Sequence, residues 1–124
     1  MSKSNSHKPT ILIADDEEGI RESFKLILED QYDLEFANNG VEALARLKTL
    51  TPDLVLLDIK MPKIHGLEIL RQIKSDKPNL PVIIVTGYQS VETAQEAIKS
   101  GASDYIPKPF DSKQILKAID QVLQ

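Results

Sequence analysis

The stretch Leu54-Val55-Leu56-Leu57-Asp58 decides the fold, because a short, unbroken apolar run ends directly in a carboxylate. Two similar runs occur, 10–14 before Asp15-Asp16 and 82–85 before Thr86. Short apolar runs without alternation are typical of strands buried on both faces, as in a parallel sheet covered by helices. The sequence therefore predicts three central strands, each followed by a polar side chain.

Weaker strands and amphipathic helices complete the pattern. The segment 32–36 alternates apolar and polar residues, and 104–106 is stopped by Pro107, so both fit sheet edges. Capping boxes at 39–42 and 111–114, and Gly101 near the end of the fourth helical segment, mark helix ends. Apolar residues recur with helical spacing between the strands, in five groups: Ile20, Phe24, Ile27 and Leu28; Val41, Leu44 and Leu47; Leu67, Leu70 and Ile73; Val91, Ala94, Ala97 and Ile98; and Ile115, Ile119, Val122 and Leu123.

Five strand–helix units in this order predict an α/β fold. Right-handed crossovers between parallel strands place helices on both faces of the sheet. With the three apolar strands central and the two weaker strands at the edges, the pattern is consistent with the order 2-1-3-4-5, a flavodoxin-like doubly wound arrangement. Other orders with the same centre also fit the pattern.

The composition fits one compact domain. The chain has 124 residues, 41% of them hydrophobic, in the usual size range for a single core. With 15 basic against 19 acidic residues and a net charge of -4, it lacks the electrostatic footprint of direct nucleic-acid binding. Cysteine is absent, and no apolar run approaches the length of a membrane helix. We expect a cytoplasmic protein, not bound to a membrane, with a flexible N-terminal tail, 1–9, and one domain, 10–124.

Polar side chains follow four of the five predicted strands. Asp15 and Asp16 follow the first strand, Asp58 the third, Thr86 the fourth and Lys108 the fifth. In open α/β sheets ligands bind outside the carboxyl ends of the strands where the winding reverses. These side chains are therefore expected to converge on one edge of the sheet.

The chemistry of this group indicates a site for a metal ion and a phosphoryl group. Carboxylates packed together repel one another and need a cation to stay ionised. Oxygen ligands of this kind suit Mg²⁺, which also accepts phosphate oxygens. One carboxylate can then act as a nucleophile and become an acyl phosphate, with Lys108 and Thr86 holding the phosphoryl oxygens.

The chain resembles the receiver domains of bacterial two-component response regulators. The resemblance covers 10–124 and rests on Asp15-Asp16, Leu57-Asp58-Ile59-Lys60-Met61-Pro62 with Gly66 beyond, Thr86-Gly87 and Lys108-Pro109-Phe110. Each motif alone is weak evidence, but all of them in order at strand–helix spacing are strong evidence.

The resemblance implies a role for each residue at this edge. Asp58 would be the phosphoacceptor, and Mg²⁺ would be bound by Asp16 directly, by Asp15 mainly through water, by Asp58 and by the backbone carbonyl of Lys60. Thr86 and Lys108 would contact the phosphoryl group, and Tyr105 would act with Thr86 as a switch. The Lys108-Pro109 bond would be cis.

The resemblance also implies the protein's partners. A sensor histidine kinase or phosphotransfer protein would supply the phosphoryl group, and an effector protein or domain would receive the signal through the face formed by helix 4, strand 5 and helix 5. That face is also the family's usual surface for a phosphorylation-dependent homodimer. The domain would be no enzyme beyond catalysing its own phosphorylation and dephosphorylation. Segments 89–94 and 102–105 resemble receivers of nitrogen-regulation-type transcriptional activators, so an N-terminal receiver of a longer activator is one alternative.

The same residues allow other interpretations. The acids 15–17 could simply complement the dipole of the first helix, and His65 fits a solvated residue at the start of the third helix. A flavodoxin-like electron carrier is disfavoured because the acids 15–18 would repel a phosphate, and a haloacid-dehalogenase-type phosphatase needs a nucleophile after the first strand and a larger chain. A pseudo-receiver that only binds partners stays open as an alternative. Lys60, which places a long cation beside the site, and His65, which stands where an acid is frequent, depart from the commonest family pattern.

Overall fold

A computed structural model describes residues 8–60, 66–88 and 90–124. Within these residues, five strands and five helices alternate. The strands are β1 (Thr10–Ala14), β2 (Asp33–Ala37), β3 (Leu54–Leu57), β4 (Val82–Thr86) and β5 (Asp104–Pro107). The helices are α1 (Glu18–Leu28), α2 (Gly40–Arg46), α3 (Gly66–Asp76), α4 (Val91–Lys99) and α5 (Ser112–Leu123).

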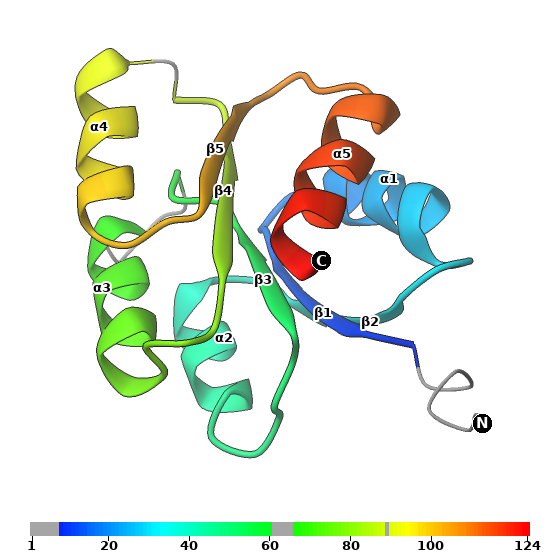
Figure 1. Cartoon of the computed structure of the whole chain (residues 1–124), viewed down its shortest axis with the longest axis horizontal. Helices are drawn as coiled ribbons and strands as arrows, with labels where there is room; N and C mark the ends of the chain where they lie inside the picture. Colours follow the sequence, from blue (N-terminus) through cyan, green and yellow to red (C-terminus); the bar gives the residue numbers. More distant parts are fainter. Residues whose placement is uncertain (1–7, 61–65, 89) are drawn as a thin grey trace.

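The strands form one parallel sheet in the order β2-β1-β3-β4-β5, as the sequence predicts. Figure 1 shows α1 and α5 on one face of this sheet and α2, α3 and α4 on the other. The winding reverses between β1 and β3, because the chain moves from β1 outward to β2 and then returns to β3 on the other side of β1. The carboxyl ends of these two strands therefore border the crevice expected for a ligand.

Alternation along the central strands supplies a core to each face. Ile11 and Ile13 of β1 pack towards α1 and α5, whereas Leu12 and Ala14 pack towards α2, α3 and α4. Both sets are fully buried, which explains why β1, β3 and β4 are unbroken apolar runs. Phe24 of α1 stacks on Phe110 at 5.0 Å between ring centroids, in the cluster that also holds the buried residues of α5.

Capping side chains start three of the helices. Asn39 accepts a hydrogen bond from the N–H of Glu42, and Asp111 accepts one from Gln114, both at 2.8 Å. The reciprocal bond of the first motif runs from the N–H of Asn38, not of Asn39, to the Glu42 carboxylate. Ser90 caps α4 in the same way, and Gly101 follows α4 with a φ of 109°, which favours glycine.

Two predicted apolar stripes are only partly buried. Val41 is 52% exposed, whereas Gly40 and Ala43 are the buried residues of α2 and Leu44 packs against the core. On α4, Ala97 is buried, whereas Val91 is 70% and Ile98 50% exposed. Few large side chains therefore anchor α4 to the sheet.

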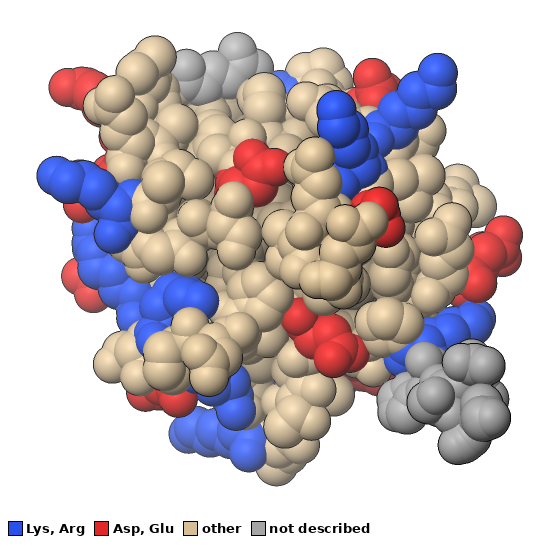
Figure 2. Space-filling model, in the orientation of Figure 1, with Lys and Arg blue, Asp and Glu red and all other residues tan. Residues whose placement is uncertain are grey.

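Within the three described segments, no helix is long and apolar enough to span a membrane. The N-terminal tail predicted at 1–9 lies mostly outside these segments, as does His65, so neither prediction is addressed. Figure 2 shows acidic and basic side chains interspersed on the face that it presents.

Candidate functional site

The polar residues after β1 and β3 are anchored to the sheet by their backbones. The N–H of Asp58 donates to the carbonyl of Ala14 at 3.0 Å, and the N–H of Asp15 donates to the carbonyl of Ala37 at 3.1 Å. These bonds continue the ladders of β3 with β1 and of β1 with β2 by one residue. Both side chains are consequently held at the carboxyl edge, where Asp15 is 1% and Asp58 3% exposed.

The ammonium of Lys108 bridges three carboxylates at this edge. Its Nζ lies 2.9 Å from Oδ2 of Asp15, 3.0 Å from Oδ2 of Asp58 and 2.8 Å from Oε1 of Glu17. The N–H of Lys108 donates to the carbonyl of Thr86 at 2.8 Å, which ties the end of β5 to β4. The Lys108-Pro109 peptide bond is cis, as the family resemblance implied.

At this site, burial and ion pairing have opposite effects on the pKa values of Asp15 and Lys108. Burial raises the pKa of the Asp15 carboxyl, although the N–H of Glu17 and the ammonium of Lys108 both favour its charged form. Burial by itself would lower the pKa of Lys108, but its bonds to Glu17, Asp15 and Asp58 together outweigh that effect, so the pKa lies above its usual range. Lys108 is therefore a permanent cation at neutral pH.

One ammonium faces an excess of negative charge. Asp15, Asp16, Glu17 and Asp58 each place a carboxylate oxygen within 4.8 Å of the others. Asp16 and Glu17 are exposed, so the cluster opens to solvent on one side. Hard oxygen ligands with an open side fit Mg²⁺, which keeps part of its water shell and accepts phosphate oxygens.

The Asp58 side chain is held by the loop that follows it. The N–H of Lys60 donates to Oδ1 of Asp58 at 2.8 Å, while Oδ2 accepts from Lys108. Gly66 packs so closely against the same loop that a Cβ at this position would lie 2.2 Å from the Cα of Ile59. The glycine of the sequence motif is thus required by close approach of two backbones.

Thr86 and Tyr105 lie beside this group and share a neighbour. Thr86 is fully buried at the end of β4, and its Oγ1 accepts from the N–H of Tyr88 at 3.4 Å. The hydroxyl of Tyr105 donates to the backbone carbonyl of Tyr88. Burial, and then the charge of Asp58, raises the pKa of the Tyr105 phenol. Both residues named from the sequence therefore contact the segment between β4 and α4.

Two neighbours of Asp15 were not identified from the sequence as parts of the site. The sequence indicates Glu17 only as an acid that complements the first helix, yet its side chain reaches Lys108, and α1 has no side-chain cap. Arg21 donates from its guanidinium to the backbone carbonyl of Asp15 at 2.7 Å. The sequence signals for these two residues are the run of acids and a basic residue one turn into the helix. Neither signal specifies where the side chain points.

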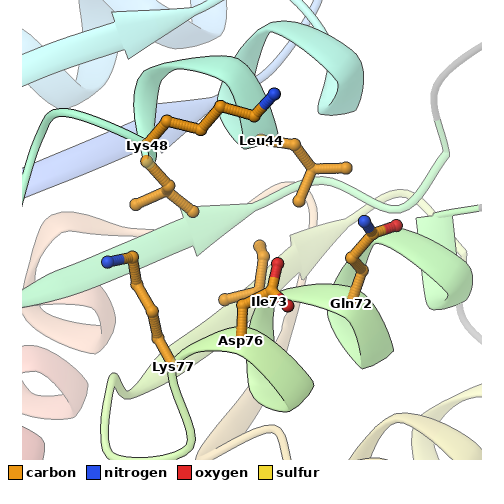
Figure 3. A pocket seen from close by; sticks show the side chains of 7 residues that line it. Leu44, Lys48, Gln72, Ile73, Asp76 and Lys77 are labelled. Carbon is orange, nitrogen blue, oxygen red and sulfur yellow. The ribbon is translucent and has the colours of Figure 1, made fainter.

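A cavity elsewhere in the domain is separate from this chemistry. It measures about 220 Å³ and lies between the C-terminal ends of α2 and α3 (Figure 3). Leu44, Leu47 and Ile73 form its apolar part. Helices that connect parallel strands run antiparallel to them, so this cavity lies near the amino edge of the sheet, opposite the acidic cluster.

Fold and site together define a doubly wound α/β domain whose carboxyl edge carries buried acids bridged by a lysine. The family model described as "Response regulator receiver domain" matches residues 11–120. The chain belongs to this family.

Individual relatives agree with this assignment. The chain is 39% identical over 115 residues to the response regulator MprA of Mycobacterium leprae, which covers 92% of the chain and 50% of MprA. It is 40% identical over 115 residues to the regulatory protein AtoC of Escherichia coli, which covers 92% of the chain and 25% of AtoC. Among solved structures, a CheY-like receiver domain protein from Methanospirillum hungatei superimposes with a TM-score of 0.90, 36% identity and 94% coverage of both chains.

The chain therefore spans about half the length of MprA and a quarter of AtoC. It is a receiver domain of a two-component response regulator.

Proposed function

We propose that this receiver domain is a switch that is phosphorylated on Asp58 in a Mg²⁺-dependent reaction. The observation that carries the proposal is the position of the Asp58 carboxylate, which is 3% exposed, beside Lys108 and within the cluster of acids that suits a divalent cation. A buried carboxylate fixed by two hydrogen bonds is a positioned nucleophile.

The residues of the site divide the work of phosphoryl transfer. Oδ of Asp58 would form a bond to phosphorus while the bond from phosphorus to the donor's leaving atom breaks. Lys108 and Thr86 would hold the transferred oxygens, since one carries a fixed positive charge and the other a hydroxyl at the end of β4. Asp15, Asp16, Asp58 and the carbonyl of Lys60 would hold Mg²⁺, which when bound offsets the repulsion between the acids and an incoming phosphoryl group.

The partners follow from this role. A sensor histidine kinase or phosphotransfer protein would donate the phosphoryl group in the cytoplasm, and an effector protein or domain would read the result. The domain would catalyse only its own phosphorylation and dephosphorylation. The lengths of MprA and AtoC favour a receiver that forms part of a longer regulator, as in the activator alternative considered above.

We expect the output to pass through α4, β5 and α5. A phosphoryl group adds a charge of about -1.5 to -2, which would draw Thr86 and Lys108 towards Asp58. Tyr88, in the segment before α4, would then rearrange because its N–H is bonded to Thr86. Tyr105 would follow, because its hydroxyl is bonded to the carbonyl of Tyr88. The weak anchoring of α4 makes it the element most easily moved.

The test is intact mass after incubation with acetyl phosphate and Mg²⁺. The wild type should gain one phosphoryl group, about 80 Da, and Asp58→Asn should gain none. Asp30→Asn, at an exposed acid outside the site, is the control and should behave as wild type. An increment that survives in Asp58→Asn would refute the assignment of Asp58, and no increment in any protein would favour a pseudo-receiver.

A further inference from the structure

Lys60 and Tyr88 meet across the carboxyl edge of the sheet, next to the acceptor. The Nζ of Lys60 lies 5.7 Å from the centroid of the Tyr88 ring, within the range of a cation–π contact. Lys60 follows β3, whereas Tyr88 follows β4, the strand beside it (Figure 1). The contact therefore joins the loop that holds Asp58 to the segment that leads into α4.

The backbone of Lys60 is fixed to the acceptor while its side chain points elsewhere. Its N–H donates to Oδ1 of Asp58 at 2.8 Å. Its stem runs past Gly87, where a Cβ would lie 3.9 Å from Cδ of Lys60. The ammonium thus starts from a point beside Asp58 but rests on an aromatic ring.

Tyr88 makes three contacts with neighbouring residues. Its N–H donates to Oγ1 of Thr86, and its carbonyl accepts from the hydroxyl of Tyr105. The third contact is the ammonium of Lys60 over its ring. Tyr88 is 45% exposed as a residue, so it is not tightly packed in the core independently of these partners.

We propose that Lys60 is a second cationic sensor of the phosphoryl group, and that its ammonium exchanges the ring of Tyr88 for phosphoryl oxygens when Asp58 is modified. This inference rests on the proposed function, since it assumes that Asp58 is the acceptor. Its consequence is a second route from the site to α4, parallel to the one through Thr86 and Tyr105.

The exchange is driven by the difference between two attractions. The ring offers only a quadrupole at a solvent-exposed contact. A phosphoryl group offers about -1.5 to -2 charges and oxygens that accept charge-assisted hydrogen bonds. Because the backbone of Lys60 is already bonded to Asp58, the ammonium needs only a change of side-chain rotamer to leave the ring.

The first test follows the Lys60–Tyr88 contact directly, by NMR with beryllofluoride as the phosphoryl mimic. In the free protein the ε-methylene protons of Lys60 should be shifted upfield by the Tyr88 ring, and Tyr88→Leu should abolish the shift. Tyr88→Phe, which keeps the ring, is the matched control and should retain it. Addition of beryllofluoride with Mg²⁺ should abolish the shift in the wild type.

Fluorine NMR of the same sample separates the two ways of failing. A signal for bound beryllofluoride with an unchanged upfield shift at Lys60 would overturn this inference alone. Absence of any bound signal would overturn the proposed site at Asp58 and this inference with it.

A double-mutant cycle on beryllofluoride affinity gives the second test. Since binding must break the ring contact, Tyr88→Leu should raise the affinity about two- to five-fold, the range of an exposed cation–π contact. The same change in a Lys60→Gln background should have no effect, whereas Lys60→Arg should restore the response. Equal effects of Tyr88→Leu in the Lys60 and Lys60→Gln backgrounds would show that the two residues act independently and would refute the proposal.

Discussion

At the scale of single residues, the buried carboxylate of Asp15 destabilises the metal-free domain. Its carboxylate is 1% exposed and lies in a cluster with three other acids. Burial raises its pKa despite the bonds from Glu17 and Lys108, so the folded state favours the protonated form more than the unfolded chain does. The charged form of Asp15 therefore lowers the stability of the metal-free domain.

We predict that Asp15→Asn stabilises the metal-free protein at neutral pH. The gain in free energy of unfolding should be largest above the raised pKa of Asp15. It should shrink as the pH falls through that pKa, because wild-type Asp15 then becomes neutral as well. Urea unfolding in the presence of a chelator at several pH values measures this dependence. The exposed control Asp30→Asn should stay within about 0.5 kcal/mol of wild type, and a gain for Asp15→Asn that does not depend on pH would contradict the explanation.

The placement of the main site residues could be predicted because it follows from topology. Asp15, Asp58 and Thr86 directly follow or end central parallel strands, and the carboxyl ends of such strands share one edge. Two side-chain contacts could not be predicted, that of Glu17 with Lys108 and that of Lys60 with Tyr88. Both depend on side-chain rotamers at a helix start and in loops, which leave no periodic pattern in the sequence.

At the scale of elements, Gly66 packs the start of α3 against the loop that carries Asp58. A Cβ at Gly66 would lie 2.2 Å from Ile59 Cα and 2.4 Å from its carbonyl oxygen, and neither backbone atom can yield cheaply. Ile59 itself is directly bonded in sequence to Asp58 and Lys60. The start of α3 is therefore in direct backbone contact with the residue that joins Asp58 to Lys60.

We predict that Gly66→Ala lowers the free energy of unfolding by about 1–3 kcal/mol, as overpacking does. Gly19→Ala is the matched control, because a Cβ at that position of α1 meets nothing within 4 Å. It should stabilise the domain by roughly 0.5 kcal/mol through the better helix propensity of alanine. Urea midpoints of both variants test the pair, and an equal response would mean that the backbone near Ile59 adjusts freely.

The central strands could be located almost to the residue, whereas the surface helices could not be oriented as well. The runs that predicted β1 and β3 match their observed bounds, since burial on both faces leaves an unbroken apolar signal. Val41 and Val91 fit a helical period but are exposed. Periodicity identifies a helix, but a short helix with small residues such as Ala43 or Ala97 in its core contact gives no clear facing direction.

At the scale of the whole molecule, the two layers of helices differ in how firmly they are attached. Phe24, Leu28, Ile115 and Ile119 anchor α1 and α5 in one fully buried cluster. In the other layer α4 contributes only Ala97 to the buried core and is tied to α3 by the exposed ion pair of Arg71 and Glu96. Exposed pairs of this kind contribute little, so a displacement of α4 costs little free energy.

The exposed side of α4 leads to a prediction about assembly. Val91 and Ile98 lie seven residues apart, so they share one side of the helix, and they are 70% and 50% exposed. If this side forms the phosphorylation-dependent homodimer expected from the family resemblance, Ile98→Asp should leave the protein folded and able to gain a phosphoryl group but should abolish self-association. Sedimentation velocity with and without acetyl phosphate and Mg²⁺ measures this self-association.

Leu26→Asp, at a 78% exposed residue of α1 in the opposite layer, is the control and should associate like wild type. Loss of association in the Leu26 variant alone would move the dimer surface to α1, and a wild type that stays monomeric when phosphorylated would leave α4 to an effector instead of a second copy.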